Sequence, residues 1–162
     1  MDKLAQQNSK YDGSRETRDR IEKVFAALIL LKESFFLGSE NRGSGIDLIE
    51  RSLDISLPES FKAFLLQFGS GGNSSLEIDG IGINEQTNMI SQTIENRKMF
   101  NSFHTKLVFF SYGEDWDYCL DTSRMEDGEC PVVEFDYVND RIIDVAPGFL
   151  DFLVDKFGLE IK

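Results

Sequence analysis

Hydrophobic positions in the first part of the chain repeat with the period of an α-helix. They follow the i, i+3, i+4, i+7, i+8 pattern through Ile21, Val24, Phe25, Leu28 and Ile29. This pattern predicts a helix over residues 15–37, followed by a polar loop over residues 38–45. Residues 1–14 are polar, carry mixed charge and show no period, so we expect a flexible tail there.

Two further helices are predicted before residue 75. A short one over residues 47–53 would direct Leu48, Ile49 and Leu53 inward. The second begins with Pro58, which suits a first helical turn because its missing N–H is not needed there, and it ends at Gly69. Its apolar stripe is Phe61, Phe64, Leu65 and Phe68. This is the clearest local signal in the chain.

Beyond residue 75 the hydrophobic period changes from 3.6 to 2, which is typical of strands. The candidate strands are residues 76–83, 107–112, 117–121, 131–137 and 141–145. Two turn pairs, Asp127-Gly128 and Asn139-Asp140, would join the last three strands as antiparallel neighbours.

Helices are also expected around these strands. One over residues 87–103 would centre on Ile90, Ile94 and Met99, and a closing one over residues 147–158 has Phe149, Phe152, Leu153 and Phe157 on one face. Helices, then a meander of strands, then a helix favour an α+β fold. We expect a twisted antiparallel sheet of five to six strands packed against about four helices, in a single domain over residues 15–162.

The net charge of -12 narrows the possible partners. A chain this acidic repels nucleic acid and anionic lipid, so direct binding to either is not expected and a cationic partner is favoured. The alternative is that the charge only maintains solubility. The longest apolar run, residues 24–31, is too short for a membrane span, and no secretory signal is visible, so the cytoplasm is the expected location.

The chain contains no convincing motif for catalysis or metal binding. His104 is the single histidine and has no nucleophile motif beside it, and the glycines at 69–72 and 80–82 lack the features of a phosphate loop. Cys119 and Cys130 match no zinc spacing and are expected as free thiols, although a disulfide remains possible. Residues 113–121 do not match a calcium loop. We therefore expect no catalytic residues, no metal, no cofactor and no enzymatic activity.

The negative charge is concentrated in one segment. Between Glu114 and Asp144 there are eleven acids and two arginines, which gives -9 of the total -12. Carboxylates steer and pair with a cationic partner, and exposed Trp and Tyr are frequent anchors of interfaces. The candidate partner-binding residues are Glu114, Asp115, Trp116, Asp117, Glu126, Asp127, Glu129, Asp136 and Tyr137. The alternative is that the aromatic residues are core and the acids a solvated face.

Two segments resemble the SUKH superfamily. One is IERSLDISLPESFKAFLLQFGSGG (residues 49–72), a short acidic-apolar helix followed by Leu-Pro and an aromatic-rich helix that ends in glycine. The other is YCLDTSRMEDGECPVVEFDYVNDRIIDVAPGFLDFLVDKF (residues 118–157), a hairpin-rich segment with a closing helix. Its central part is similar to bacterial immunity proteins of the YobK type.

The resemblance implies an α+β domain without catalytic residues. It also implies an immunity protein, or antitoxin, that neutralises the C-terminal domain of a cognate polymorphic toxin. The expected toxin is a basic nuclease whose cationic active site would meet the acidic face, and the expected state is a monomer or weak dimer. The alternative is a regulatory, protein-binding scaffold of the same superfamily.

Overall fold

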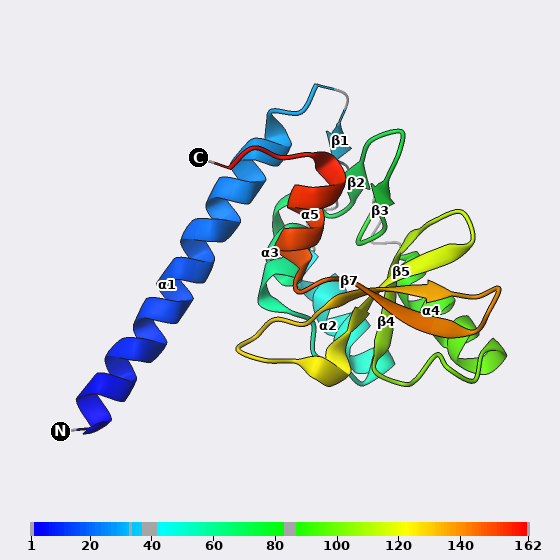
Figure 1. Cartoon of the computed structure of the whole chain (residues 1–162), viewed down its shortest axis with the longest axis horizontal. Coiled ribbons are helices and arrows are strands. Elements are labelled where there is room, and N and C mark those ends of the chain that lie inside the picture. Colours follow the sequence, from blue (N-terminus) through cyan, green and yellow to red (C-terminus); the bar gives the residue numbers. More distant parts are fainter. Residues whose placement is uncertain (1, 33, 37–41, 83–86, 162) are drawn as a thin grey trace.

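The computed structural model describes residues 2–32, 34–36, 42–82 and 87–161, which adopt an α+β fold. The helices are α1 (Asp2–Ile29), α2 (Arg42–Leu53), α3 (Glu59–Phe68), α4 (Asn88–Met99) and α5 (Phe149–Phe157). The strands are β1 (Phe35–Phe36), β2 (Gly71–Gly72), β3 (Glu77–Ile78), β4 (Leu107–Tyr112), β5 (Trp116–Asp121), β6 (Val132–Asp136) and β7 (Arg141–Ala146), and η2 (Thr122–Arg124) is a short 3₁₀ turn. Figure 1 shows α1 running away from the rest of the molecule toward its N-terminus.

The strands form two antiparallel sheets rather than the single sheet that the sequence predicts. Sheet A has the order β1-β2-β3 and contains only two-residue strands, whereas sheet B has the order β4-β5-β6-β7. Both predicted turns are present in sheet B. Asp127 and Gly128 have positive φ angles of 52° and 79°, and Asp140 has a φ of 52°, as tight hairpin turns require.

Helix α3 lies at the centre of the main hydrophobic core, as its apolar stripe predicts. Phe61, Phe64 and Leu65 are fully buried, and the Phe61 ring packs edge-on against Phe149 of α5 at 4.8 Å between centroids. Gly69 ends the helix with a φ of 74°, and its N–H donates to Leu65 O. The predicted stripe of α5 is also buried, which confirms the phase of both helices.

Sheet B is covered on both faces. Val108 and Phe110 of β4 face the main core, while Leu107 and Phe109 face a smaller cluster that includes Phe103 and Phe135. A strand buried on both faces reads as a continuous apolar run, which LVFFSY shows in the sequence. Helix α4 packs beside β4, where the Phe109 N–H donates to the Thr93 hydroxyl at 3.0 Å, and its Met89 belongs to the main core.

The predicted bounds of the first helix are wrong at both ends. Helix α1 begins at Asp2, so the backbone of the expected tail is helical; a run of good helix formers, LAQQ, lies within it. It ends at Ile29 rather than Leu37, because Phe36 lies in β1, opposite Gly71, and its ring packs on Phe68 at 4.4 Å. Pairing with a distant strand overrides the local helical pattern here.

Other predicted bounds also change. Of the expected loop over residues 38–45, residues 42–45 belong to α2 and residues 38–41 lie outside the described residues. The expected strand over residues 76–83 is reduced to β3, and residue 83 is outside the described residues. Helix α4 is shorter than predicted, because Phe100 has an extended backbone.

Several apolar side chains predicted to be buried are instead exposed. They are Ile29 (56% exposed), Leu48 (47%) and Met99 (65%), while Ile46 and Met89 are buried in their helices. The neighbours of each helix decide which side of a wide apolar stripe is covered, and the stripe alone does not show this.

Candidate partner-binding surface

The predicted site residues fall at opposite ends of sheet B. Glu114, Asp115, Trp116, Asp136 and Tyr137 lie where β4 meets β5 and where β6 meets β7, which we call the hairpin end. Glu126, Asp127 and Glu129 lie in the β5–β6 connection beside α3, which we call the α3 end. A six-residue strand separates the two ends by about 17–20 Å. The strands therefore hold the two groups of predicted residues apart, and their role in binding a partner stays a prediction.

At the α3 end, Glu129 is part of the fold. The Ser60 N–H and hydroxyl donate to its two carboxylate oxygens at 2.9 and 2.6 Å, so Glu129 satisfies the N-terminus of α3 from a distant segment. Burial raises the pKa of Glu129, and the hydrogen bonds from Ser60 act in the opposite direction. Because Ser60 is fully buried, this contact is structural rather than open to a partner.

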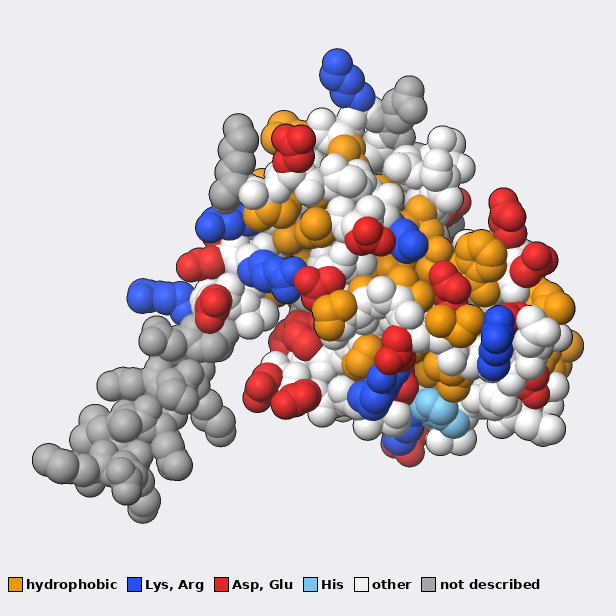
Figure 2. Space-filling view, in the orientation of Figure 1, with side chains coloured by type: hydrophobic (Ala, Val, Ile, Leu, Met, Phe, Trp, Pro, Cys, Tyr) orange, Lys and Arg blue, Asp and Glu red, His pale blue; other side chains and the backbone are white. Residues whose placement is uncertain are grey.

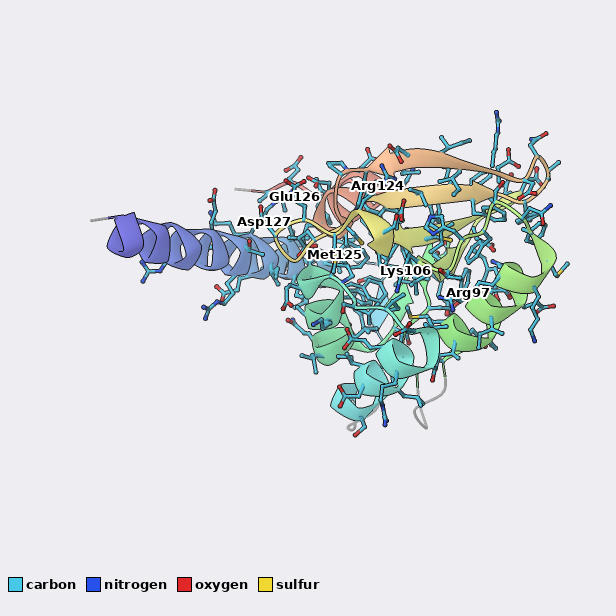
Figure 3. The ribbon with its side chains drawn as sticks, turned by 90° about the horizontal axis from the view of Figure 1, so that it is seen from below. Arg97, Lys106, Arg124, Met125, Glu126 and Asp127 are labelled. Carbon is cyan, nitrogen blue, oxygen red and sulfur yellow. The ribbon has the colours of Figure 1, made fainter. Side chains whose placement is uncertain are left out.

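Glu126 and Asp127 occupy the exposed turn next to Glu129. Figure 3 shows both residues at the outer end of the β5–β6 connection. Backbone hydrogen bonds join Glu126 and Glu129 across this turn, and the Glu59 N–H donates to Gly128 O at 2.8 Å. The turn is thus held against the start of α3, while the side chains of Glu126 and Asp127 remain exposed.

Arg124 neutralises two further carboxylates at the same end. Its Nε donates to Asp121 Oδ2 at 2.9 Å and its Nη2 to Asp144 Oδ1 at 2.6 Å. These bonds raise the pKa of Arg124, and the contact with Arg124 lowers the pKa of Asp144. The charge that the sequence assigns to this part of the surface is therefore partly paired within the molecule.

His104 has a contact at each ring nitrogen. Its Nδ1 accepts the Lys106 N–H at 3.2 Å, which leaves Nε2 to carry the ring hydrogen, 3.5 Å from Asp121 Oδ1. No nucleophilic side chain is among these contacts. Within the described residues no group of three or more His, Cys, Asp or Glu could hold a metal ion. Cys119 and Cys130 are both buried free thiols, as predicted.

The basic side chains near the end of α2 also serve the fold. Arg97 donates to Leu53 O at 3.2 Å and to Thr105 O at 2.6 Å, and Lys106 Nζ donates to Asp54 O at 2.7 Å. Figure 3 shows Arg97 and Lys106 on the same side of the molecule. Both cations bind carbonyls at a helix C-terminus, where positive charge is favourable.

At the hairpin end, Glu114 and Asp115 are exposed in the turn between β4 and β5. The Tyr137 hydroxyl donates to the backbone oxygen of Glu114 at 2.6 Å and connects this turn to the β6–β7 hairpin. Asp136, directly before Tyr137, pairs with Arg141 at 3.0 Å and accepts two hydrogen bonds from Asn139. These contacts lower the pKa of Asp136 to about 2, so it is a structural carboxylate.

Trp116 does not form the exposed anchor that the sequence predicts. It is half-buried and packs against the main core, with its ring 6.3 Å from Tyr118. Its indole lies flat on Gly113, so closely that a Cβ there would be 2.3 Å from Nε1. Its indole N–H is buried without an acceptor among the described residues.

Asp117 is also inside the fold. It is only 4% exposed and accepts a hydrogen bond from Asn96 Nδ2 of α4 at 3.0 Å. The network continues outward, because Gln92 Nε2 donates to Asn96 Oδ1 and the Tyr112 hydroxyl donates to Gln92 Oε1, both at 2.9 Å. Burial raises the pKa of Asp117 and the bond from Asn96 opposes this shift. Asp117 therefore anchors α4 to sheet B.

The structure adds residues to the hairpin end that the sequence did not suggest. Tyr112 is 51% exposed, and the partial burial of its phenol, followed by the negative charges of Asp79, Asp117 and Glu95, raises the pKa of that group. Burial and the charge of Glu77 raise the pKa of Asp79 to about 6. We call the set Glu77, Asp79, Glu95, Tyr112, Glu114, Asp115 and Tyr137 the acidic tip. No pattern in the sequence predicts that these residues lie together, because β3, α4 and β4 come into contact only in the folded protein.

The carboxylates of the acidic tip have no cationic partner within the part of the chain that the structure describes. None of the ion pairs there includes Glu77, Asp79 or Glu95, and none includes Glu114 or Asp115. Figure 2 shows that, on the face it presents, Asp and Glu are spread among Lys and Arg around a band of hydrophobic side chains. Glu126 and Asp127 at the α3 end also form no ion pair with a described residue, so what distinguishes the acidic tip is its larger number of such carboxylates, five against two.

The chain matches a known family over most of its length. A family model described as SUKH_5, SMI1-KNR4 cell-wall, matches residues 37–158. The chain belongs to the SUKH superfamily. This confirms the family resemblance seen in the sequence, whereas the narrower similarity to YobK-type proteins stays a prediction. Proteins of the SUKH superfamily bind partner proteins and are generally not catalytic, which is consistent with an immunity-type role.

No helix in the described ranges is long and apolar enough to cross a bilayer.

Proposed function

We propose that this SUKH protein is an immunity protein that binds and neutralises a cognate toxin, expected to be a basic nuclease, through its acidic tip. The observation that carries the proposal is the group of unpaired carboxylates around Tyr112, next to the exposed pair Glu114 and Asp115. A nuclease active site is cationic because it binds phosphate. Carboxylates that enter or cover such a site would compete with the substrate's phosphates.

Asp79 supports a cationic partner. A half-buried carboxylate whose pKa is raised to about 6 lacks a compensating positive charge. A lysine or arginine from a partner would supply that charge and lower the pKa again. Tyr112 and Tyr137 add partly exposed aromatic rings, which are frequent anchors of protein interfaces.

Of the nine residues predicted from the sequence, Glu114, Asp115 and Tyr137 remain the best candidates for direct contact. Glu126 and Asp127 are exposed but lie at the other end of sheet B. Asp117, Glu129, Asp136 and Trp116 are expected to act through the fold, since each is buried, paired or packed against the core.

The test is co-purification of the protein with the product of the adjacent gene, followed by a nuclease assay on RNA and DNA. We expect a stable complex in which nuclease activity is lost. Replacing Glu114 and Asp115 with Gln and Asn should restore activity at matched concentrations. A complex with a partner that has no toxic activity would instead favour a regulatory scaffold, and a complex unaffected by these substitutions would exclude the acidic tip.

A further inference from the structure

We infer that the free edge of β7 is a docking element for an extended, cationic segment of a partner protein, which adds to sheet B as a fifth strand. The inference rests on the proposed function for the identity of the partner. The β7 edge also extends the proposed function, because this backbone surface is not part of the acidic tip.

Strand β7 is an open edge of sheet B. In the order β4-β5-β6-β7, β7 pairs with β6, and no other described strand lies beside it. The opposite edge is occupied, because the Asp79 N–H donates to Phe110 O of β4 at 2.8 Å and the Ser111 hydroxyl donates to Glu77 O at 2.6 Å. Figure 3 shows β7 along the outer rim of the molecule, with no helix or strand beyond it.

The charged side chains of β7 are turned away from this edge. Proteins commonly protect an edge strand with charges, and β7 carries Arg141 and Asp144. Arg141 is held by Asp136 on β6, directly opposite in the register, and Asp144 is held by Arg124 at the end of β5. Both partners lie on the sheet side of β7, so these ion pairs leave the outer edge of the backbone open.

The length of the available edge is set by a bulge. Residues 141–144 pair with β6 in regular register, and the register shifts between Val132 and Val133, which leaves Val145 without an opposite residue. Bulges end strand addition because they bend the edge. The edge therefore offers a run of four residues, long enough for a short ladder of backbone hydrogen bonds.

The side chains around the edge indicate what would bind. Ile143 is 38% exposed and Val138 in the adjoining turn is 66% exposed, so apolar contacts are available. The segment from Val132 to Ala146 contains four acids (Glu134, Asp136, Asp140 and Asp144), and Arg141 and Arg124 pair with two of them, so this part of sheet B keeps a net negative charge. A second copy of the chain would bring the same negative charge to this edge, whereas a segment that alternates basic and apolar residues complements it.

The experiment uses the full chain, labelled with ¹⁵N, and a short peptide that alternates lysine and valine with blocked ends. We expect the peptide to slow hydrogen exchange at every second amide of residues 141–144, because alternate N–H groups of an edge strand point outward. A matched peptide carries methyl groups on alternate backbone nitrogens. It keeps the charge but cannot extend a sheet, and we expect it to bind at least about tenfold more weakly. Equal binding of the two peptides would overturn the inference, because charge alone would then explain it.

Two variants make the test residue-specific. Ile143→Lys places a cation on the edge. We expect this substitution to lower the affinity for the alternating peptide by about tenfold through like-charge repulsion. Leu48→Lys makes the same change of net charge on α2, at a residue that is 47% exposed and on a helix that packs against α3 and α4, and we expect less than a twofold effect. Melting temperatures within a few degrees of the parent would show that both variants are folded. Equal weakening by both would overturn the inference.

The two proposals can fail separately. If the peptide adds to β7 while the neighbouring gene product is neither bound nor inhibited, the edge inference stands and the immunity function falls. If a toxin is neutralised while the amides of residues 141–144 exchange as fast in the complex as in the free protein, the edge inference falls alone.

Discussion

The two ends of sheet B contain similar residues and use them differently. At the α3 end, Glu129 completes the start of α3, and Arg124 joins Asp121 to Asp144. At the hairpin end, Glu114 and Asp115 are exposed and form no ion pair with any described residue. A high density of carboxylates in the sequence therefore does not identify a binding surface by itself. Burial and internal partners decide which charges stabilise the fold and which remain for another molecule.

This comparison also explains why the acidic tip is a better candidate than the acidic segment as a whole. Steering of a charged partner depends on the field of carboxylates that no internal cation offsets. At the α3 end Arg124 pairs with Asp121 and Asp144, and the exposed Glu126 and Asp127 form no ion pair, whereas the acidic tip holds five such carboxylates among the described residues. Substitutions at the two ends test this division, and they are ordered here by their expected effect on folding.

The contact of Glu129 with Ser60 gives the largest predicted effect. In Glu129→Ala the buried hydroxyl and N–H of Ser60 lose their acceptor, and each unsatisfied group costs about 1–3 kcal/mol. We expect the free energy of unfolding to fall by about 2–4 kcal/mol in urea titrations. Glu126→Ala, in the same turn but exposed, is the matched control and should change it by less than about 0.5 kcal/mol. Similar losses for both variants would show that the two ends do not differ in this way.

Substitution of Asp79 should increase the free energy of unfolding, whereas substitution of Glu129 decreases it. Its pKa is about 6 in the fold against 3.8 for a free aspartate, so its ionisation opposes folding, and stability falls as the pH rises from about 4 through 6. Asp79→Asn removes this cost and should raise the free energy of unfolding at pH 7 by about 1 kcal/mol, after allowance for solvent screening of a half-exposed group. The gain should vanish at pH 4. A variant that is less stable than the parent at pH 7 would contradict the description of Asp79 as an unpaired charge.

Tyr137 tests how firmly the two hairpins are joined. Tyr137→Phe removes the hydroxyl that donates to Glu114 O and should lower the free energy of unfolding by about 0.5–1 kcal/mol, since the bond is exposed. Faster amide exchange in the β4–β5 turn is the more direct measurement. If exchange there is unchanged, the bond does not hold Glu114 and Asp115 in place.

Neutralisation of the acidic tip should have the smallest effect on folding and a large one on association. Glu114→Gln with Asp115→Asn should change the free energy of unfolding by less than about 0.5 kcal/mol, because both side chains are exposed. The rate of association with the cognate toxin, measured by stopped flow, should fall by about tenfold at low salt. The difference from the parent protein should shrink as salt screens the charges.

The control for this variant makes the same change of charge on α1. Glu16→Gln with Asp19→Asn alters two exposed residues outside sheet B and should leave the association rate nearly unchanged. Equal slowing by both double variants would show that only net charge matters.

The sequence by itself determined the parts of this protein that depend on neighbours along the chain. The stripe of Phe61, Phe64 and Leu65, the strand segments of β4 to β7 and the Asp127-Gly128 turn are all local patterns, and the structure confirms them. The order of these patterns along the chain was also enough to identify the SUKH superfamily. The tertiary structure decided the end of α1, the division into two sheets and the roles of the carboxylates. Glu129 meets Ser60 from 69 positions away, and β3, α4 and β4 form the acidic tip only after packing. Such contacts depend on which surfaces the fold brings together, and no periodicity along the chain encodes them.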